Sequence, residues 1–261
     1  MIDDKFKELR IKLRHSSKKI IHNILDNHFD PENNAGLPDI CIFCGSSKTL
    51  TKEHVIPKWV FESDPDMYFV TTSNQLSQTF NRSTVPACVK CNTTYLSYIE
   101  KYVQSILSRS DLDTSATYFE LINLLRWMEI IEYKFHVLEF RRKYKASKKD
   151  GYEPILSNVP LSVWRRNIKD SPYKAVAELR KSQKEITVKN KDSKFHSLVI
   201  FGLTDPESHF IHSMNSYLFF SLPQYNKALF YFIKEEFDDY STATEEARKI
   251  IIHTYEHEKN H

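Results

Sequence analysis

The sequence predicts an α+β protein in which a small cysteine-bearing module lies between helical segments and a C-terminal domain with a small antiparallel sheet. Apolar residues recur at helical spacing over residues 3–29 and 115–140. All four cysteines fall into two Cys-x-x-Cys steps, "CIFC" and "CVKC". Short β-branched or aromatic runs, separated by polar turns, begin at residue 184. We therefore expect four parts: an N-terminal helical segment (1–39), the cysteine module (40–110), a long helix with a basic linker (111–150) and an α+β domain of unknown role (151–261).

Composition narrows the class of protein. Hydrophobic residues make up 41% of the 261 residues and charged residues 27%, as in ordinary globular proteins. The opening "MIDDKFKELR" is charged from its third residue, which is unlike a secretory signal, and no apolar run is long enough to span a bilayer. We expect a cytoplasmic protein with no membrane partner. None of the four glycines belongs to a G-x-G-x-x-G or G-x-x-x-x-G-K-[ST] pattern, which excludes Rossmann and P-loop nucleotide sites.

Charge is unevenly distributed along the chain, although the net charge is only +3. Residues 5–19 carry seven Lys or Arg against one Glu, and the run "RRKYKASKK" at 141–149 carries six with no acid. Residues 234–261 carry eight acids against four Lys or Arg. The two basic stretches suit either a polyanionic partner or a solvated helix face, and the sequence leaves both readings open.

The elements are expected in the following order. The helix 3–29 ends in the turn-forming "DPENNAGLPD". The helix 115–140 has an apolar stripe wider than a coiled-coil seam, which favours a core helix over the alternative, a homodimer contact. The runs "KEITV", "SLVIFGL", "SYLFFSL" and "ALFYFI" predict strands of an antiparallel sheet, and "STATEEARKIIIHTYEHE" predicts a closing helix.

The two Cys-x-x-Cys steps predict a structural zinc site with four thiolate ligands: Cys41, Cys44, Cys88 and Cys91. Each step turns the chain so that two sulfur atoms converge on one ion. Gly45, directly after Cys44, suits the positive φ that such a turn often needs. Disulfides are the alternative, and reducing conditions in a cytoplasm disfavour them.

The 43 residues between the two steps predict an inserted hairpin. "TLTKEHVIP" reads as a strand that ends at Glu53-His54, and "STVPACVKCN" as a second strand that enters the second step. "NTTYLSYIEKYV" then begins a helix. Because zinc would join the base of the hairpin to the start of the helix, we expect Glu53, His54 and Asn92 to come together.

These residues resemble the HNH, or ββα-metal, endonuclease superfamily, and in particular its branch braced by a four-cysteine zinc. The matching residues are the four cysteines, Glu53-His54 and Asn92, and "EHVIPKW" and "CVKCN" are similar to bacterial HNH nucleases of anti-phage defence and restriction systems. The resemblance covers about a quarter of the chain.

The resemblance implies a metal-dependent endonuclease that hydrolyses phosphodiester bonds in DNA. Glu53 and Asn92 would hold a catalytic Mg²⁺ or Mn²⁺, and His54 would be the general base. The middle asparagine of the motif would be Asn81 or Asn74, of which Asn81 is nearer the second cysteine step. Lys52, Lys58 and Arg82 are candidates for phosphate contacts. RNA is not excluded as a substrate. Targeting is expected to come from the C-terminal region or from a partner protein, and a partner protein is also a candidate source of activation.

A non-catalytic zinc module that binds nucleic acid or protein is the alternative, because it would share the cysteines without needing Glu53, His54 and Asn92. The "HEKNH" at 257–261 spells the zinc-protease pattern H-E-x-x-H. A helix end that frays offers no closed pocket, so we do not expect a protease.

Overall fold

The computed structural model describes residues 1–28, 38–62, 68–70, 77–143, 152–153, 159–160, 172–213 and 215–258. The chain forms two compact units. The first comprises Met1–Tyr102 and Glu129–Thr187, and the second comprises Val103–Met128 and Val188–His261. Both helices and small antiparallel sheets are present, so the predicted α+β class is confirmed. Among the described residues, no helix combines the length and apolar character needed to cross a bilayer.

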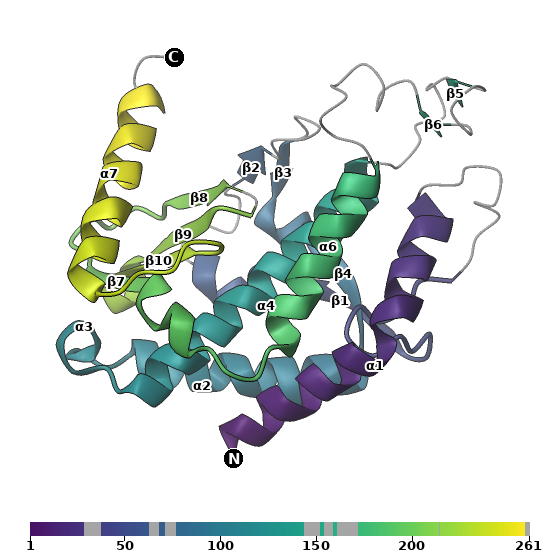
Figure 1. Ribbon diagram of the computed structural model, residues 1–261, viewed down its shortest axis with the longest axis horizontal. Coiled ribbons are helices and arrows are strands. Elements are labelled where there is room, and N and C mark those ends of the chain that lie inside the picture. Colours follow the sequence, from purple (N-terminus) through teal and green to yellow (C-terminus); the bar gives the residue numbers. More distant parts are fainter. Residues whose placement is uncertain are drawn as a thin grey trace. The chain divides into compact units, whose positions relative to one another are not determined.

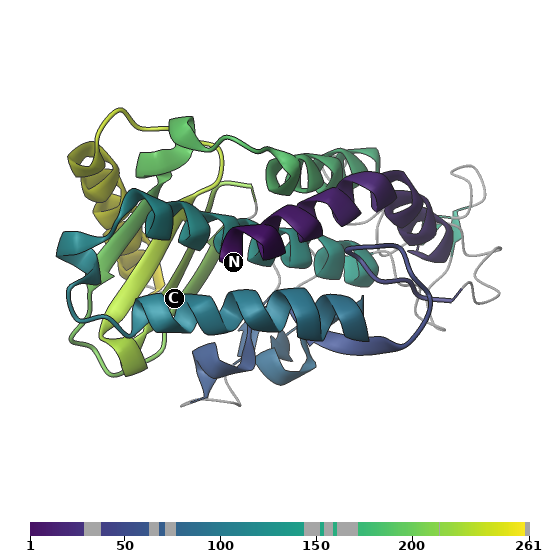
Figure 2. The same ribbon diagram turned by 90° about the horizontal axis from the view of Figure 1, so that it is seen from below.

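Two helices of the first unit pack side by side. These are α1 (Ile2–His28) and α6 (Pro172–Thr187), which run next to each other in both views (Figure 1, Figure 2). The predicted N-terminal helix is therefore confirmed. Six of its apolar residues recur at helical spacing and are buried: Phe6, Leu9, Leu13, Ile20, Ile21 and Ile24.

The predicted strand, strand and helix of the cysteine module are present in that order. β1 (Leu50–His54) pairs antiparallel with β4 (Thr84–Cys88), and His54 lies opposite Thr84. A π-helical turn, η3 (Cys91–Leu96), then leads into α2 (Ser97–Leu107). The short elements around the hairpin are η1 (Lys58–Phe61), β2 (Tyr68–Val70), which pairs with β3 (Ser77–Thr79), and η2 (Phe80–Arg82). A further two-stranded pair joins β5 (Tyr152–Glu153) to β6 (Val159–Pro160).

The long helix α4 (Tyr118–Lys143) is buried almost all round, as the prediction of a core helix requires. Its buried side chains include five from Glu, Lys or His: Glu129, Glu132, Lys134, His136 and Glu139. Within the basic run that ends this helix, Arg141 donates two hydrogen bonds to Asp39, at 2.7 and 2.9 Å. Residues 144–149 of that run lie outside the described part of the chain.

The second unit is built on a four-stranded antiparallel sheet in the order β7-β10-β9-β8. The strands are β7 (Leu198–Gly202), β8 (Phe210–Ser213), β9 (Tyr217–Leu222) and β10 (Lys227–Phe232). The closing helix is α7 (Tyr240–Glu258), and the short helical turns are α3 (Leu112–Ser115), η6 (Asp192–Ser197) and η7 (Pro223–Tyr225). The predicted last three strands and closing helix are thus confirmed.

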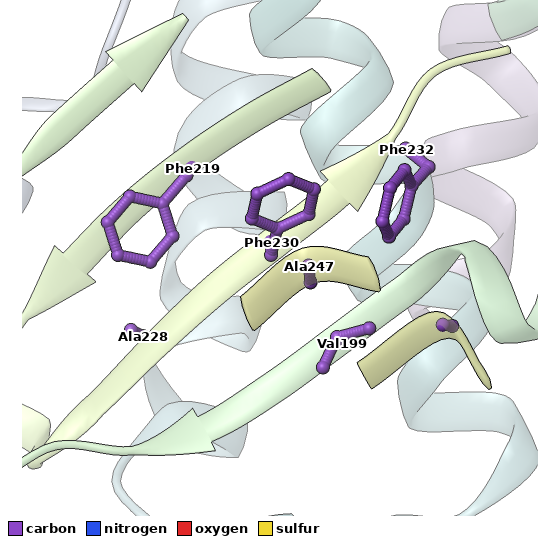
Figure 3. Close-up of a cluster of buried hydrophobic side chains, with 7 residues drawn as sticks. Val199, Phe219, Ala228, Phe230, Phe232 and Ala247 are labelled. Atoms are coloured by element: carbon purple, nitrogen blue, oxygen red, sulfur yellow. The ribbon is translucent and has the colours of Figure 1, made fainter. Parts of the chain in front are cut away.

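One hydrophobic cluster of this unit lies between the sheet and α7. Figure 3 shows the rings of Phe219, Phe230 and Phe232 on neighbouring strands, with Ala247 of α7 close to them. Ala243 and Ala247 are one helical turn apart and are both fully buried. Their small side chains let the helix backbone approach the sheet closely.

One predicted strand is wrong. "KEITV" at 184–188 was expected to be β, but α6 continues through Thr187. Val176, Leu179 and Gln183 are buried at helical spacing along α6. The first four residues of "KEITV" form the last turn of this helix. The edge strand β8 was not predicted, since its side chains are only half-buried and its pattern is weak.

Candidate functional site

The four cysteines form one cluster. The sulfur atoms of Cys41, Cys44, Cys88 and Cys91 all lie within 4.8 Å of one another, and those of Cys44 and Cys88 are 3.6 Å apart. The predicted convergence is confirmed, and the sulfur atoms are close enough to bind one metal ion such as zinc.

The first cysteine step is a tight turn that depends on glycine. The backbone N–H of Gly45 donates to the carbonyl of Cys41 at 2.8 Å, and the N–H of Cys41 donates to Ser46 at 2.8 Å. Gly45 has φ +65°, in the left-handed region, as expected from its place after Cys44. A Cβ at this position would also lie 3.2 Å from the side chain of Lys19.

The backbone joins both cysteine steps to the hairpin. The N–H of Ile42 donates to Pro86 of β4 at 3.0 Å, and the N–H of Val89 donates to Thr49 at 2.9 Å. The N–H of Cys91 points at the sulfur of Cys88, 3.4 Å away. The base of the hairpin and the start of the helix are therefore held at the cysteine cluster.

Side chains from three helices support the first step. The hydroxyl of Ser16 on α1 donates to the carbonyl of Cys44 at 2.9 Å. The hydroxyl of Tyr133 on α4 donates to the carbonyl of Ile42 at 2.6 Å, and Gln183 on α6 donates to that hydroxyl at 3.4 Å. Burial of the ring raises the pKa of Tyr133, so the hydroxyl keeps its proton and remains a donor.

Burial and the neighbouring sulfur atoms shift the pKa values of these thiols. A hydrogen bond from Cys91 lowers the pKa of Cys41 to about 5, whereas burial raises the pKa of Cys44 to about 11. The neighbouring Cys41 sulfur and burial both raise the pKa of Cys91. Four thiolates this close together repel one another unless a cation lies between them.

A pocket of about 570 Å³ adjoins the hairpin. It receives the three side chains that the sequence expected to meet, Glu53, His54 and Asn92, together with Asn81. The other residues that line it come from β1, η1, η2, α2 and the residues that flank η1: Lys52, Ile56, Pro57, Lys58, Trp59, Phe61, Glu62, Phe80, Ser97 and Glu100. One concave surface thus contains an acid, an imidazole and an amide.

Glu53 is buried, with only 6% of its surface exposed. Its carboxylate forms an ion pair with the ammonium group of Lys134, which has an exposed fraction of 1%. The same ammonium donates to the backbone carbonyl of His54 at 3.0 Å and lies 3.8 Å from the carboxylate of Glu100. A carboxylate in this setting requires a compensating cation, and the lysine provides it.

His54 is half-buried at the end of β1. Burial lowers the pKa of its imidazole, and the positive charge of Lys58 lowers it further. The carboxylate of Glu53 and a hydrogen bond to the backbone of Asn81 oppose this shift. The imidazole is therefore neutral near pH 7, the form that can accept a proton.

Asn92 lies in the π-helical turn that follows the second cysteine step. Its amide NH₂ donates to the hydroxyl of Thr51 on β1 at 3.0 Å, so the contact does not use its amide oxygen. A π turn is wider than an α turn and is common at functional sites. Asn81 is on η2, beside His54, whereas Asn74 lies outside the described residues.

Sequence reasoning missed two residues here, Glu100 and Lys134. Burial raises the pKa of Glu100 to about 7, against the opposite pull of Lys134. Glu100 follows Asn92 by eight positions on the continuing helix, so its spacing offered a weak signal. Lys134 is 81 positions from Glu53, and the residues near it in the sequence gave no signal of the pairing.

The remaining candidates are divided. Lys52 and Lys58 are exposed and line the pocket, whereas Arg82 is exposed on η2 and is not among the lining residues. The side chain of His257 and residues 259–261 of the "HEKNH" pattern lie outside the described part of the chain.

Comparisons of the chain with family models, with curated proteins and with solved structures found no match.

Proposed function

We propose that this chain is a metal-dependent HNH endonuclease that hydrolyses phosphodiester bonds in DNA. One observation carries the proposal: Glu53, His54 and Asn92 line a single pocket at the end of a hairpin whose base adjoins the four-cysteine cluster. An isolated Glu-His pair would carry no such weight. The strand, strand and helix order around the pocket also fits this class of nuclease.

Two different metal ions fit the two donor sets. Four sulfur atoms within 4.8 Å suit Zn²⁺, and because all four positions would be filled, that ion would be structural. The carboxylate of Glu53 and the amide oxygen of Asn92 are the hard oxygen donors that Mg²⁺ or Mn²⁺ prefers. When bound there, such an ion would stabilise negative charge on the phosphoryl oxygens and on the leaving 3′ oxygen.

His54 would act as the general base. Its neutral imidazole takes a proton from a water molecule as the water oxygen bonds to phosphorus and the bond from phosphorus to the 3′ oxygen breaks. The leaving oxygen gains a proton from solvent, and His54 releases its own to solvent. The hydrogen bond to the Asn81 backbone would hold the ring toward the pocket.

The substrate would be held by charge as well as by the pocket. Lys52 and Lys58 are exposed at its rim and would contact backbone phosphates, which carry no sequence information. Target choice would then come from elsewhere in the chain, from a partner protein or from a homodimer. An anti-phage defence or restriction role in the cytoplasm fits a nuclease of this kind.

A second candidate is a non-catalytic zinc module that binds nucleic acid or protein. The ion pair between Glu53 and Lys134 favours it, because a carboxylate already satisfied by a buried cation can serve a purely structural role. This alternative leaves His54 without a function.

Cleavage of supercoiled plasmid by the purified, zinc-loaded protein in Mg²⁺ or Mn²⁺ tests the proposal. We expect wild-type protein to nick or linearise the plasmid and His54→Ala to lose at least about a hundredfold in rate, as removal of a general base does. The matched control is His253→Ala, on the exposed side of α7.

His54→Ala should keep its zinc and its melting temperature, and His253→Ala should cleave like wild type. A His54→Ala protein as active as wild type would refute the catalytic assignment. A parallel incubation with single-stranded RNA distinguishes the two nucleic acids.

A further inference from the structure

A buried lysine lies directly behind the pocket. The ammonium group of Lys134 has three N–H donors, and three oxygen groups surround it: the carboxylates of Glu53 and Glu100 and the backbone carbonyl of His54. Lys134 itself is not among the described residues that line the pocket. Its side chain therefore acts from the protein interior.

The two carboxylates face the pocket from different elements. Glu53 lies on β1 and Glu100 on α2, and both line the pocket that also receives Asn92. The side chain of Glu100 is 21% exposed and lies further from the ammonium group than Glu53 does. One buried positive charge thus serves two acids, and the group carries one net negative charge when both are ionised.

We propose that Glu100 is a further acidic residue of the site, and that Lys134 is an internal counter-cation which Glu53 and Glu100 share and which limits how strongly the pocket attracts a divalent cation. The inference rests on the proposed function, since the proposed function makes Glu53 a ligand of the divalent cation. Lys134 is a positioning residue in this scheme. It acts through Glu53 and through the backbone of His54, and touches no substrate.

Two substitutions should change divalent binding in opposite directions. Lys134→Met removes the positive charge and leaves two acids facing the pocket, which should raise its affinity for a divalent cation. Glu100→Gln keeps the shape and removes one negative charge, which should lower that affinity. A unit charge several ångströms from a divalent ion in a partly buried site changes its binding by roughly tenfold or more.

Binding of Mn²⁺ to the zinc-loaded full chain, followed by electron paramagnetic resonance at pH 8, is the test. All proteins carry His209→Ala, because Asp205, Glu207 and His209 offer ligand atoms within 4.8 Å of one another and can bind a cation themselves. We expect Lys134→Met to bind Mn²⁺ about tenfold more tightly than its parent, and Glu100→Gln about tenfold more weakly.

Lys194→Met is the matched control. Lys194 is also a buried lysine, and its ammonium donates to the carbonyl of Ile233 at 2.5 Å in the second unit. Its loss should lower the melting temperature without changing Mn²⁺ affinity. If Lys134 has a purely structural role, Lys134→Met should also have a lower melting temperature and unchanged Mn²⁺ affinity. Parental Mn²⁺ affinity in both Lys134→Met and Glu100→Gln would overturn the inference.

Should Lys134→Met fail to fold, Glu100→Gln decides alone: weaker Mn²⁺ binding supports the inference and unchanged binding overturns it. The proposed nuclease function fails separately, when wild-type protein cleaves no nucleic acid while the two variants still shift Mn²⁺ binding as expected. Conversely, cleavage by wild type with unchanged binding in both variants refutes only the role of Glu100 and Lys134.

Discussion

At the scale of single residues, Glu100 is a carboxylate whose charged form the fold disfavours. Burial raises its pKa to about 7 from an ordinary value of 4.5. Because the folded state holds the proton more tightly than the unfolded state, this group opposes folding as pH rises from 4.5 through about 7. Below pH 4.5 both states are protonated, and the penalty disappears.

Glu100→Gln should therefore stabilise the protein in a pH-dependent way in buffer free of Mg²⁺ and Mn²⁺. We expect a gain of less than about 0.5 kcal/mol at pH 4.5 and of about 2 to 3 kcal/mol at pH 8. Urea unfolding at several pH values measures this. The matched control is Glu256→Gln, on an exposed position of α7. A gain that is constant across the pH range would contradict the assignment.

Tyr133 is a second residue whose single polar atom has a defined task. Its hydroxyl donates to the carbonyl of Ile42, inside the first cysteine step. Tyr133→Phe leaves that buried carbonyl without this donor, which should cost about 1 to 3 kcal/mol of unfolding free energy. Chemical denaturation measures the loss. Tyr98→Phe, at a position 47% exposed, is the control and should cost far less.

At the scale of elements, the hairpin β1–β4 depends on the cysteine cluster. Its register places Leu50 opposite Cys88, so the last pair of the hairpin is part of the second cysteine step. A two-stranded hairpin alone is marginal in water. A metal ion bound by the four sulfur atoms would supply the missing stability, because binding and folding of such a step are coupled.

Removing that metal with a chelator should open the hairpin. The amide protons of Ile42 and Val89, which donate to the carbonyls of Pro86 and Thr49, should lose hydrogen-exchange protection. Amides of β10 in the second unit, such as Leu229, should stay protected and serve as the internal control. Unchanged protection at Ile42 and Val89 would show that the cluster does not support the hairpin.

The elements also show which local patterns were informative. β1 and β4 could be predicted because Pro57 follows the first strand and the second cysteine step follows the other. The π turn at Cys91–Leu96 could not, since its residues are compatible with an α turn and only the surrounding contacts widen it. The prediction for "KEITV" failed for a related reason: a five-residue run with three β-branched side chains fits the end of a helix as well as a strand.

At the scale of the whole molecule, long-range contacts were the part that the sequence did not reveal. The cysteines were found because each Cys-x-x-Cys step is a distinctive local pattern, and Glu53, His54 and Asn92 were found because they follow these steps in the sequence. Lys134 pairs with Glu53 across 81 positions, and nothing near either residue specifies that pairing. Nor does the sequence indicate that Glu129–Thr187 joins the unit that contains the hairpin.

Chemical rescue of His54 tests the central claim most directly. His54→Gly removes the imidazole, and imidazole added to the buffer can take its place beside the attacking water. We predict that His54→Gly, folded and zinc-loaded, cleaves plasmid in Mg²⁺ only when imidazole is present, at a rate that rises with the concentration of the neutral base. A His54→Gly protein that cleaves at the wild-type rate without imidazole would contradict the account.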